Sequence, residues 1–309
     1  MSRNQRIDPS SLPNFFVIGA MKAATTTLHA LLHQHPQVFC THPKETFFFS
    51  NDARFARGIE WYAHTYFHGA ERYPARGEST THYLYWSNKV APRMAESYPD
   101  GQIGLIAVLR DPVARAYSHY WWDVSRGSES RSFEDALSLE AGRLADNHDQ
   151  FECTSSTGFG YFRGGCYAAL LEPFLERFPR DRLFFVLQED LQERFAETMS
   201  ALARFLQVDP AFAFEQVHLN PAVRQRNQLV HAIYQRMTQP FPLKGALKVL
   251  LPSSVRTRLR RLGRGMSLET FPYPPMDPST EKALRERFAP DVERLARIIQ
   301  RDLKAWLPT

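Results

Sequence analysis

The sequence predicts an open α/β fold, in which a central parallel sheet is covered by helices on both faces. Short apolar runs of strand length alternate with helical patterns over the first two thirds of the chain. That alternation is typical of strand–helix units that build a parallel sheet. The composition agrees, because 43% hydrophobic and 23% charged residues in a chain of 309 are ordinary for a globular enzyme with a sizeable core.

The first half of the chain supplies four predicted strands and three predicted helices. Residues 14–19 (NFFVIG) have the pattern of a buried strand, and residues 25–36 that of a helix which starts at a threonine and stops at Pro36. The further elements expected here are a short strand at 37–40, an edge strand at 75–80, a helix at 88–99, a strand at 102–110 and a helix at 111–127. Asp111 can cap this last helix, and Pro112 suits its first position.

In the second half of the chain, helices and strands are predicted near the beginning and at the end. A helix is expected at 165–179, a strand at 181–188, a helix at 193–208 and a final helical segment at 277–307. Asp277 and Pro278 are start signals for the final segment, and Pro290 should interrupt it. Residues 209–275 are rich in Pro, Arg and Gln, and we predict no strand there. We therefore expect a single P-loop-like domain over 1–309, with a basic, loop-rich and helical insertion at about 209–275.

The charge and the cysteine content restrict the classes of ligand and metal site that the protein can have. The net charge of +5 and the pI near 9.1 favour an anionic ligand, although such a charge also serves solubility alone. Three widely spaced cysteines, at 40, 153 and 166, exclude a disulfide framework and a CxxC zinc motif, and we predict no metal. The first residues lack an apolar core of signal-peptide length, and no run approaches a membrane span, so we expect a cytoplasmic protein.

The stretch GAMKAATTT, residues 19–27, joins a predicted strand to a predicted helix and predicts an anion-binding loop. Such a turn presents backbone N–H groups and the positive end of the helix dipole to one point. The candidate binding residues are Lys22, Ala23, Ala24, Thr25, Thr26 and Thr27. The G-x-x-x-x-G-K-[ST] order of a triphosphate loop is absent. The alternative is that Thr25 only caps the helix and Lys22 is only a surface charge.

A second stretch, VLRDPVARAYSHYWW, places an arginine directly after a buried strand. Arg110 therefore belongs at the carboxyl edge of the sheet, where open α/β folds bind ligands. A guanidinium suits bidentate contact with a phosphate, and Ser118 follows two turns along the next helix. The alternative is that Arg110 pairs with a carboxylate at the sheet edge.

Together these two stretches resemble the sulfotransferase family. Residues 15–32 resemble the loop that binds the 5′-phosphosulfate of PAPS (3′-phosphoadenosine 5′-phosphosulfate). The second stretch resembles that family's 3′-phosphate element, whose arginine and serine fall on Arg110 and Ser118. Residues 165–191 and 276–307 are similar to its central and closing segments. The branch that the chain most resembles is the heparan-sulfate-type and bacterial one. The K-x-x-x-T-V-x-x-x-E dimerisation motif of the aryl and steroid branch is missing near the C-terminus.

The resemblance implies a PAPS-dependent sulfotransferase of the EC 2.8.2 class. Such an enzyme moves the sulfuryl group to a hydroxyl or amine by in-line displacement and releases PAP, the 3′,5′-bisphosphate, without a metal. Lys22 would stabilise the leaving phosphate. The stretch CTHPKETFFFS resembles the family's K-E-x-x-x-F loop, whose glutamate is the catalytic base, and that role carries over to Glu45. Lys44 beside it would steady the sulfate or the carboxylate.

Two histidines are alternative bases. His42 precedes the K-E pair, and a histidine titrates near neutral pH. His82 lies in GESTTHYLY, which resembles the family's G-E-K-S-P-x-Y segment with Thr80 and Thr81 in place of Ser-Pro. For either histidine the alternative is a surface or packing role.

Residues 260–275, before the closing segment, resemble the family less closely. Arg260, Arg261 and Arg264 are candidates for the 3′-phosphate, but RRLGRGMSLETFPYPP does not match the family's G-R-x-x-P stretch. The cluster can equally be a solvated helix face or bind an acidic acceptor such as a sulfated glycan. Because no DNA-binding motif accompanies it, we predict no nucleic-acid partner.

The sequence leaves the acceptor and two other functions open. We expect a small-molecule or glycan acceptor without choosing among a sugar, lipid, polyketide, phenol or amine, and no oligomeric state is predicted. A non-catalytic anion- or glycan-binding module of the same fold is one alternative. A P-loop-like nucleotide kinase is another, against which the missing G-K-[ST] counts.

Overall fold

The computed structural model describes residues 12–146, 159–217, 223–225, 268–270 and 273–308. The strands are β1 (Phe15–Gly19), β2 (Val38–Cys40), β3 (Ala75–Ser79), β4 (Gly104–Leu109), β5 (Leu183–Leu187), β6 (Val223–Gln225) and β7 (Leu268–Thr270). The α-helices are α1 (Thr25–Leu32), α2 (Asp52–Phe55), α3 (Gly58–Phe67), α4 (His82–Tyr85), α5 (Ser87–Ser97), α6 (Pro112–Arg126), α7 (Phe133–Asp146), α8 (Tyr167–Leu175), α9 (Asp190–Glu193), α10 (Phe195–Phe205) and α14 (Pro278–Ile299). Short 3₁₀ helices cover Arg163–Gly165, Arg180–Arg182 and Lys304–Trp306.

The first five strands form one sheet in the order β2-β3-β1-β4-β5, and every neighbouring pair is parallel. The predicted parallel sheet is therefore confirmed. Since β1 and β4 are neighbours, the loop after Gly19 and the residue after Leu109 begin at the same edge of the sheet. This is the edge at which open α/β folds bind their ligands.

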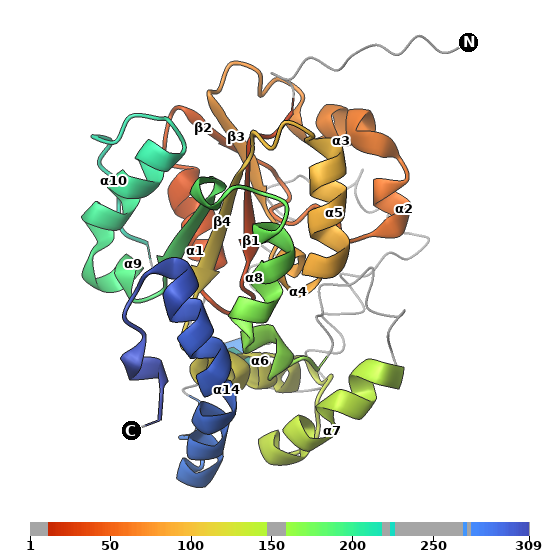
Figure 1. Cartoon of the computed structure of the whole chain (residues 1–309), viewed down its shortest axis with the longest axis vertical. Helices are drawn as coiled ribbons and strands as arrows, with labels where there is room; N and C mark the ends of the chain where they lie inside the picture. Colours follow the sequence, from red (N-terminus) through yellow and green to blue (C-terminus); the bar gives the residue numbers. More distant parts are fainter. Residues whose placement is uncertain (1–11, 147–158, 218–222, 226–267, 271–272, 309) are drawn as a thin grey trace, which may run out of the picture. The chain divides into compact units, whose positions relative to one another are not determined.

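Helices cover the sheet on both faces, as predicted. Figure 1 shows α1 and α10 on one side of the sheet and α5 and α8 on the other. The strands are accordingly apolar on both faces, and Phe16, Val17 and Ile18 of β1 are all fully buried. A continuous apolar run such as FFVI is what a parallel strand between two helical layers requires.

The strand β3 lies between β2 and β1, so the expectation of an edge strand was wrong. Its sequence, ARGES, looks too polar for an interior strand, but all five residues are buried. A side chain at Gly77 would meet the ring of Phe15 at 2.5 Å, so the glycine lets the neighbouring strand pack closely. Glu78 is tolerated because its carboxylate is fully hydrogen-bonded.

The final helix, α14, continues through Pro290, so the expected interruption was also wrong. A proline inside a helix costs about 3 kcal/mol. Buried residues on both sides of it, among them Phe288 and Val292, keep one apolar face against the protein. In addition, the Asp291 carboxylate accepts hydrogen bonds from the backbone of Ala168 (3.0 Å), at the start of α8. We infer that this packing outweighs the local cost of the proline.

The predicted helix starts are confirmed at two places. The Asp111 carboxylate accepts hydrogen bonds from the N–H groups of Val113 and Ala114 at the start of α6, at 2.8 and 3.0 Å. Asp277 accepts one from the N–H group of Ser279, at 2.9 Å, at the start of α14. Each caps a helix whose N-terminal N–H groups would otherwise lack partners.

The chain forms two compact units. The first comprises Met1–His119, Ser132–Leu219 and Met276–Thr309, and it contains the parallel sheet. The second comprises Tyr120–Arg131 and Asn220–Pro275. In the second unit β6 and β7 pair in antiparallel fashion, so the region at 209–275 contains a strand pair that the sequence did not predict.

Candidate active site

The backbone of the loop between β1 and α1 is strained at two residues. Lys22 and Ala24 adopt left-handed conformations, with φ of 69° and 66°. For residues other than glycine this costs about 1–3 kcal/mol each, and such strain clusters at functional sites. Ala24 is the N-cap of α1, and no side chain of the described residues caps this helix. The alternative role of Thr25 as the N-cap is therefore wrong, because Thr25 is the first residue of the helix.

The single glycine of this loop serves packing. A side chain at Gly19 would lie 2.6 Å from Cβ of Leu84, so the glycine lets α4 approach the end of β1. A small cavity is lined by Met21 on this loop and by Thr81 and Tyr85 at α4. The loop at 19–27 and the segment around Thr81 thus line the same small cavity.

Arg110 follows β4, at the carboxyl edge of the sheet where it was expected, and lies against the loop at 19–27. Its guanidinium donates a hydrogen bond to the backbone oxygen of Lys22, at 3.3 Å. The neighbouring carboxylate of Asp111 is paired with Arg285 instead, at 3.0 Å, and Arg110 forms no ion pair among the described residues. Ser118 lies on α6 and is 6% exposed. Arg110 itself is half-buried beside the loop, and its positive charge can bind an anion.

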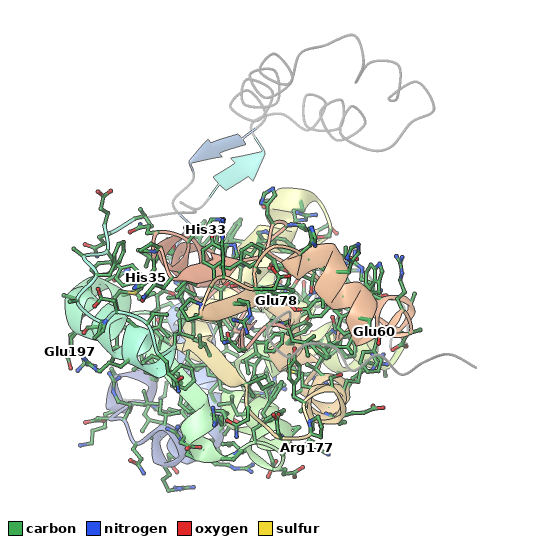
Figure 2. All side chains as sticks on the ribbon, turned by 90° about the horizontal axis from the view of Figure 1, so that it is seen from above. His33, His35, Glu60, Glu78, Arg177 and Glu197 are labelled. Atoms are coloured by element: carbon green, nitrogen blue, oxygen red, sulfur yellow. The ribbon has the colours of Figure 1, made fainter. Side chains whose placement is uncertain are left out.

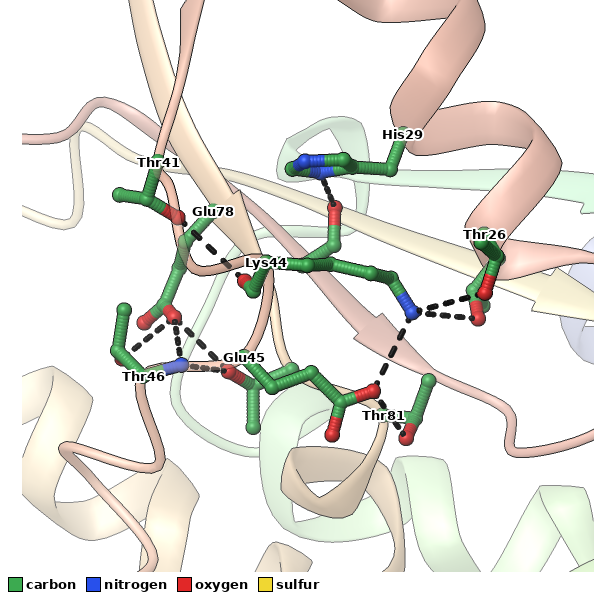
Figure 3. Close-up of polar contacts among 11 residues, drawn as sticks. Thr26, His29, Thr41, Lys44, Glu45, Thr46, Glu78 and Thr81 are labelled. Atoms are coloured by element: carbon green, nitrogen blue, oxygen red, sulfur yellow. Dashed lines mark hydrogen bonds and ion pairs between the residues drawn. The ribbon is translucent and has the colours of Figure 1, made fainter. Parts of the chain in front are cut away.

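The loop between β2 and α2 supplies a lysine–glutamate pair that reaches α1 (Figure 3). Nζ of Lys44 lies 3.2 Å from the Glu45 carboxylate, 3.3 Å from Oγ1 of Thr25 and 3.4 Å from Oγ1 of Thr26. The hydroxyl of Thr81 donates to the same Glu45 oxygen, at 3.2 Å. The Glu45 side chain is 25% exposed, so it can meet a second substrate. The predicted base is therefore connected to the first turn of α1 through one lysine.

Glu78 holds this loop in place, and sequence reasoning missed it. Its carboxylate is completely buried and accepts hydrogen bonds from Tyr62 (2.6 Å), Tyr83 (2.7 Å) and Thr80 (2.8 Å). It also accepts them from both the backbone N–H and the hydroxyl of Thr46, the residue after Glu45. Figure 2 shows Glu78 in the interior of the molecule. Burial raises the pKa of Glu78, and the hydrogen bonds oppose that rise. An acidic residue inside a predicted strand was the signal that could have revealed it.

The histidines differ sharply in environment. His42 is exposed. His82 is 2% exposed, its Nε2 has no hydrogen-bond partner among the described residues, and burial lowers its pKa to about 4. A histidine with so low a pKa is a weak base at neutral pH. His29, which sequence reasoning did not single out, lies on α1 and shares a hydrogen bond of 2.9 Å with Ser79. Burial, and then the charge of Lys44, lower its pKa to about 4.

Of the remaining predicted site residues, the structure describes Ala23 and Thr27. Ala23 is buried in the loop, and Thr27 is half-buried in the first turn of α1. Arg260, Arg261 and Arg264 lie outside the described residues, as does Cys153. Cys40 and Cys166 are free thiols, and burial raises the pKa of each to about 12.

The chain is similar to known sulfotransferases. Residues 12–258 match the sulfotransferase domain family. The chain is 39% identical over 115 residues to the membrane-associated sulfotransferase kil1 of Dictyostelium discoideum, over 37% of this chain and 23% of that protein. It is 30% identical over 227 residues to the human bifunctional heparan sulfate N-deacetylase/N-sulfotransferase 3, over 66% of this chain and 23% of that protein. The matches thus span less than a quarter of the length of these two relatives.

One solved structure is similar over nearly its whole length. It is a sulfotransferase from Alicyclobacillus acidocaldarius, with a TM-score of 0.67 and 25% identity, covering 95% of this chain and 98% of that one. The chain thus has an α/β fold in which the loop at 19–27 and Arg110 lie together at the carboxyl edge of the parallel sheet. The chain belongs to the sulfotransferase family, as the two motif stretches predicted.

Within the ranges that the structure describes, no helix is both long and apolar enough to cross a membrane. In the same ranges, no group of three or more His, Cys, Asp or Glu side chains is arranged to hold a metal ion.

Proposed function

We propose that this sulfotransferase takes the sulfuryl group from PAPS and transfers it to a hydroxyl or amine of a small-molecule or glycan acceptor. The observation that supports this most is the contact of Lys44 with Glu45 on one side and with Thr25 and Thr26 on the other. It brings a carboxylate that can accept a proton to the first turn of the helix that can bind the donor anion.

The donor would be held by the loop at 19–27. The uncapped N-terminus of α1 offers backbone N–H groups and the positive end of the helix dipole. The hydroxyls of Thr25 and Thr26 can donate to anionic oxygens. Lys22 would stabilise the charge that develops on the leaving phosphate. Because PAPS carries no γ-phosphate, the loop does not need the metal-binding hydroxyl of a triphosphate loop.

The far end of the donor would meet Arg110 and Ser118. The Arg110 guanidinium already donates to the backbone of the loop and has no carboxylate partner among the described residues. Its planar N–H groups suit a phosphate, to which it can make charge-assisted hydrogen bonds. We assign it to the 3′-phosphate.

Glu45 would act as the base. As the acceptor atom forms its bond to sulfur, the bond between sulfur and the bridging oxygen breaks, and the electron pair leaves with the 5′-phosphate of PAP. The proton of the acceptor hydroxyl or amine passes to the Glu45 carboxylate. Positioning and charge stabilisation would provide most of the rate acceleration, as in loose phosphoryl transfer.

The acceptor class remains broad, and one relative suggests where to begin. The human protein is, by its name, an N-sulfotransferase of heparan sulfate. We therefore include a glycan with free amino groups among the first acceptors to test, beside simple sugars, phenols and alcohols.

Titration calorimetry with PAP tests the donor site directly. We expect binding in EDTA, and no binding of Mg·ATP at the same protein concentration. Lys22→Ala should weaken PAP binding, whereas Lys304→Ala, on an exposed side chain far along the sequence, should not. Failure of folded protein to bind PAP would overturn the proposal, and tight binding of Mg·ATP alone would support a nucleotide kinase.

A further inference from the structure

The ammonium of Lys44 lies between the proposed base, Glu45, and the first turn of α1. Its ammonium lies 3.2 Å from Glu45, 3.3 Å from the hydroxyl of Thr25 and 3.4 Å from that of Thr26 (Figure 3). The first contact is within the loop after β2, and the other two are to the first turn of α1. One cation therefore touches both the proposed base and two proposed donor-binding groups.

This lysine is held in place by its surroundings. Its side chain is 19% exposed, which is low for a residue type that is normally solvated. Its backbone oxygen accepts hydrogen bonds from the hydroxyl of Thr41 and the N–H of Ser79, both at 3.4 Å, so β3 fixes the loop beneath it. Burial lowers the pKa of Lys44, and the charge of Glu45 opposes that change. Fixed geometry and partial burial are what an electrostatic role in catalysis requires.

The contacts to the threonines do not compete with donor binding. A threonine hydroxyl has one O–H to donate and two lone pairs to accept with. Thr25 and Thr26 can therefore accept from the ammonium while each donates its own proton to an oxygen of a bound anion. An anion bound at these hydroxyls would lie next to the Lys44 charge, on the side of the site that faces Glu45.

We propose that Lys44 is a second catalytic cation, whose ammonium contacts the oxygens of the sulfuryl group during transfer. The inference rests on the proposed function and divides the work between two lysines. Lys22 would act on the leaving phosphate, and Lys44 on the group in transit. Lys44 stays protonated throughout. When Glu45 accepts the proton of the acceptor it becomes neutral, so the ammonium is left to balance the charge of the new sulfate ester.

The two ligands PAPS and PAP separate these roles, because only PAPS carries the sulfuryl group. We would measure the affinity of both for the wild type, Lys44→Met, Lys44→Arg and Lys22→Met. Lys44→Met should weaken PAPS binding by about tenfold or more, the size of one charge-assisted contact, and leave PAP binding within about twofold. Lys22→Met should weaken the binding of both PAPS and PAP. Lys44→Arg, which keeps the charge, should recover part of the preference for PAPS.

A matched control is Lys89→Met. Lys89 forms an ion pair with Asp52, at 3.3 Å, on the α2 and α5 side of the structure, and its loss should change neither affinity. Thermal unfolding of each variant shows whether the fold is kept. Should Lys44→Met lose its fold, Lys44→Gln provides the same comparison with a polar, neutral side chain.

The outcomes distinguish this inference from the proposed function. Equal loss of PAPS and PAP affinity in Lys44→Met would overturn it, because the lysine would then act on the loop as a whole. No loss for either ligand would overturn it too. If the wild type bound neither ligand, the proposed function itself would fall, and with it the role of Lys44.

Discussion

The carboxylate of Glu78 accepts a hydrogen bond from the backbone N–H of Thr46, 3.2 Å away, in the residue directly after Glu45. The same carboxylate binds the hydroxyl of Thr80, directly before Thr81, which donates to Glu45. One buried acid therefore fixes both segments that position the proposed base. Rigid support of this kind is what holds a catalytic group within a few tenths of an ångström.

Glu78→Met should strongly destabilise the protein. The variant keeps the length of the side chain but leaves the hydroxyls of Tyr62 and Tyr83 without their acceptor. An unsatisfied buried polar group costs about 1–3 kcal/mol, so the free energy of unfolding should fall by about 3 kcal/mol. Denaturant titration measures this. Glu60→Met, on the exposed face of α3, is the control and should change stability by less than about 0.5 kcal/mol. Equal stability of the two variants would contradict the role given to Glu78.

Arg110→Ala should chiefly weaken PAP binding. The charge-assisted contact with the 3′-phosphate is worth about 1.5–3 kcal/mol, or roughly tenfold to more than a hundredfold in Kd. The matched control is Arg72→Ala, since Arg72 is an exposed side chain that lies against Tyr73. Calorimetry on the two variants should show the loss only for Arg110. An unchanged affinity would mean that another group binds the 3′-phosphate.

Stability should fall as the pH drops from about 6.5 towards 4. Burial lowers the pKa of His82 and of His29 to about 4, whereas an unfolded histidine titrates near 6.5. Between these values the unfolded chain binds more protons, so the free energy of unfolding falls as the pH falls. Each histidine can contribute at most about 3 kcal/mol, at about 1.4 kcal/mol per pH unit.

The variant His82→Gln isolates one of these contributions. Denaturant titrations at several pH values should show a shallower loss of stability below pH 6.5 than in the wild type. His68→Gln removes an exposed histidine next to α3 and should leave the slope unchanged. A slope in His82→Gln that matches the wild type would show that His82 does not stay neutral in the folded protein.

Local sequence patterns predicted most of the sheet and its crossovers. β1, β4 and β5 are apolar runs of strand length, and Asp111 marks the start of α6 through its own side chain. Such signals need only near neighbours in the sequence. The position of β3 was misjudged, because its acid is satisfied by Tyr62 and Thr46, which are distant in sequence. The interruption expected at Pro290 was wrong for the same reason. Packing of the buried residues of α14 offsets the cost of a proline inside the helix.

The sequence proposed candidate residues for the site but not the contacts that join them. The resemblance pointed to Lys22, Glu45 and Arg110, and the structure places Arg110 against the backbone of Lys22. The contact of Lys44 with Thr25 depends on how the loop after β2 packs against α1, and no sequence pattern records that packing. The same is true of the burial that makes His82 a weak base.

Transfer of radiolabelled sulfate from PAPS is the measurement that tests the central claim most directly. Wild type and Glu45→Gln would be offered a panel of acceptors: a glycan with free amino groups, simple sugars, phenols, long-chain alcohols and amines. We expect the wild type to label at least one class, and Glu45→Gln to bind PAP normally while its turnover falls by orders of magnitude. Equal labelling by the two proteins would contradict the role of Glu45. Tight binding of PAP with no labelled product in any class would contradict the proposed transfer itself.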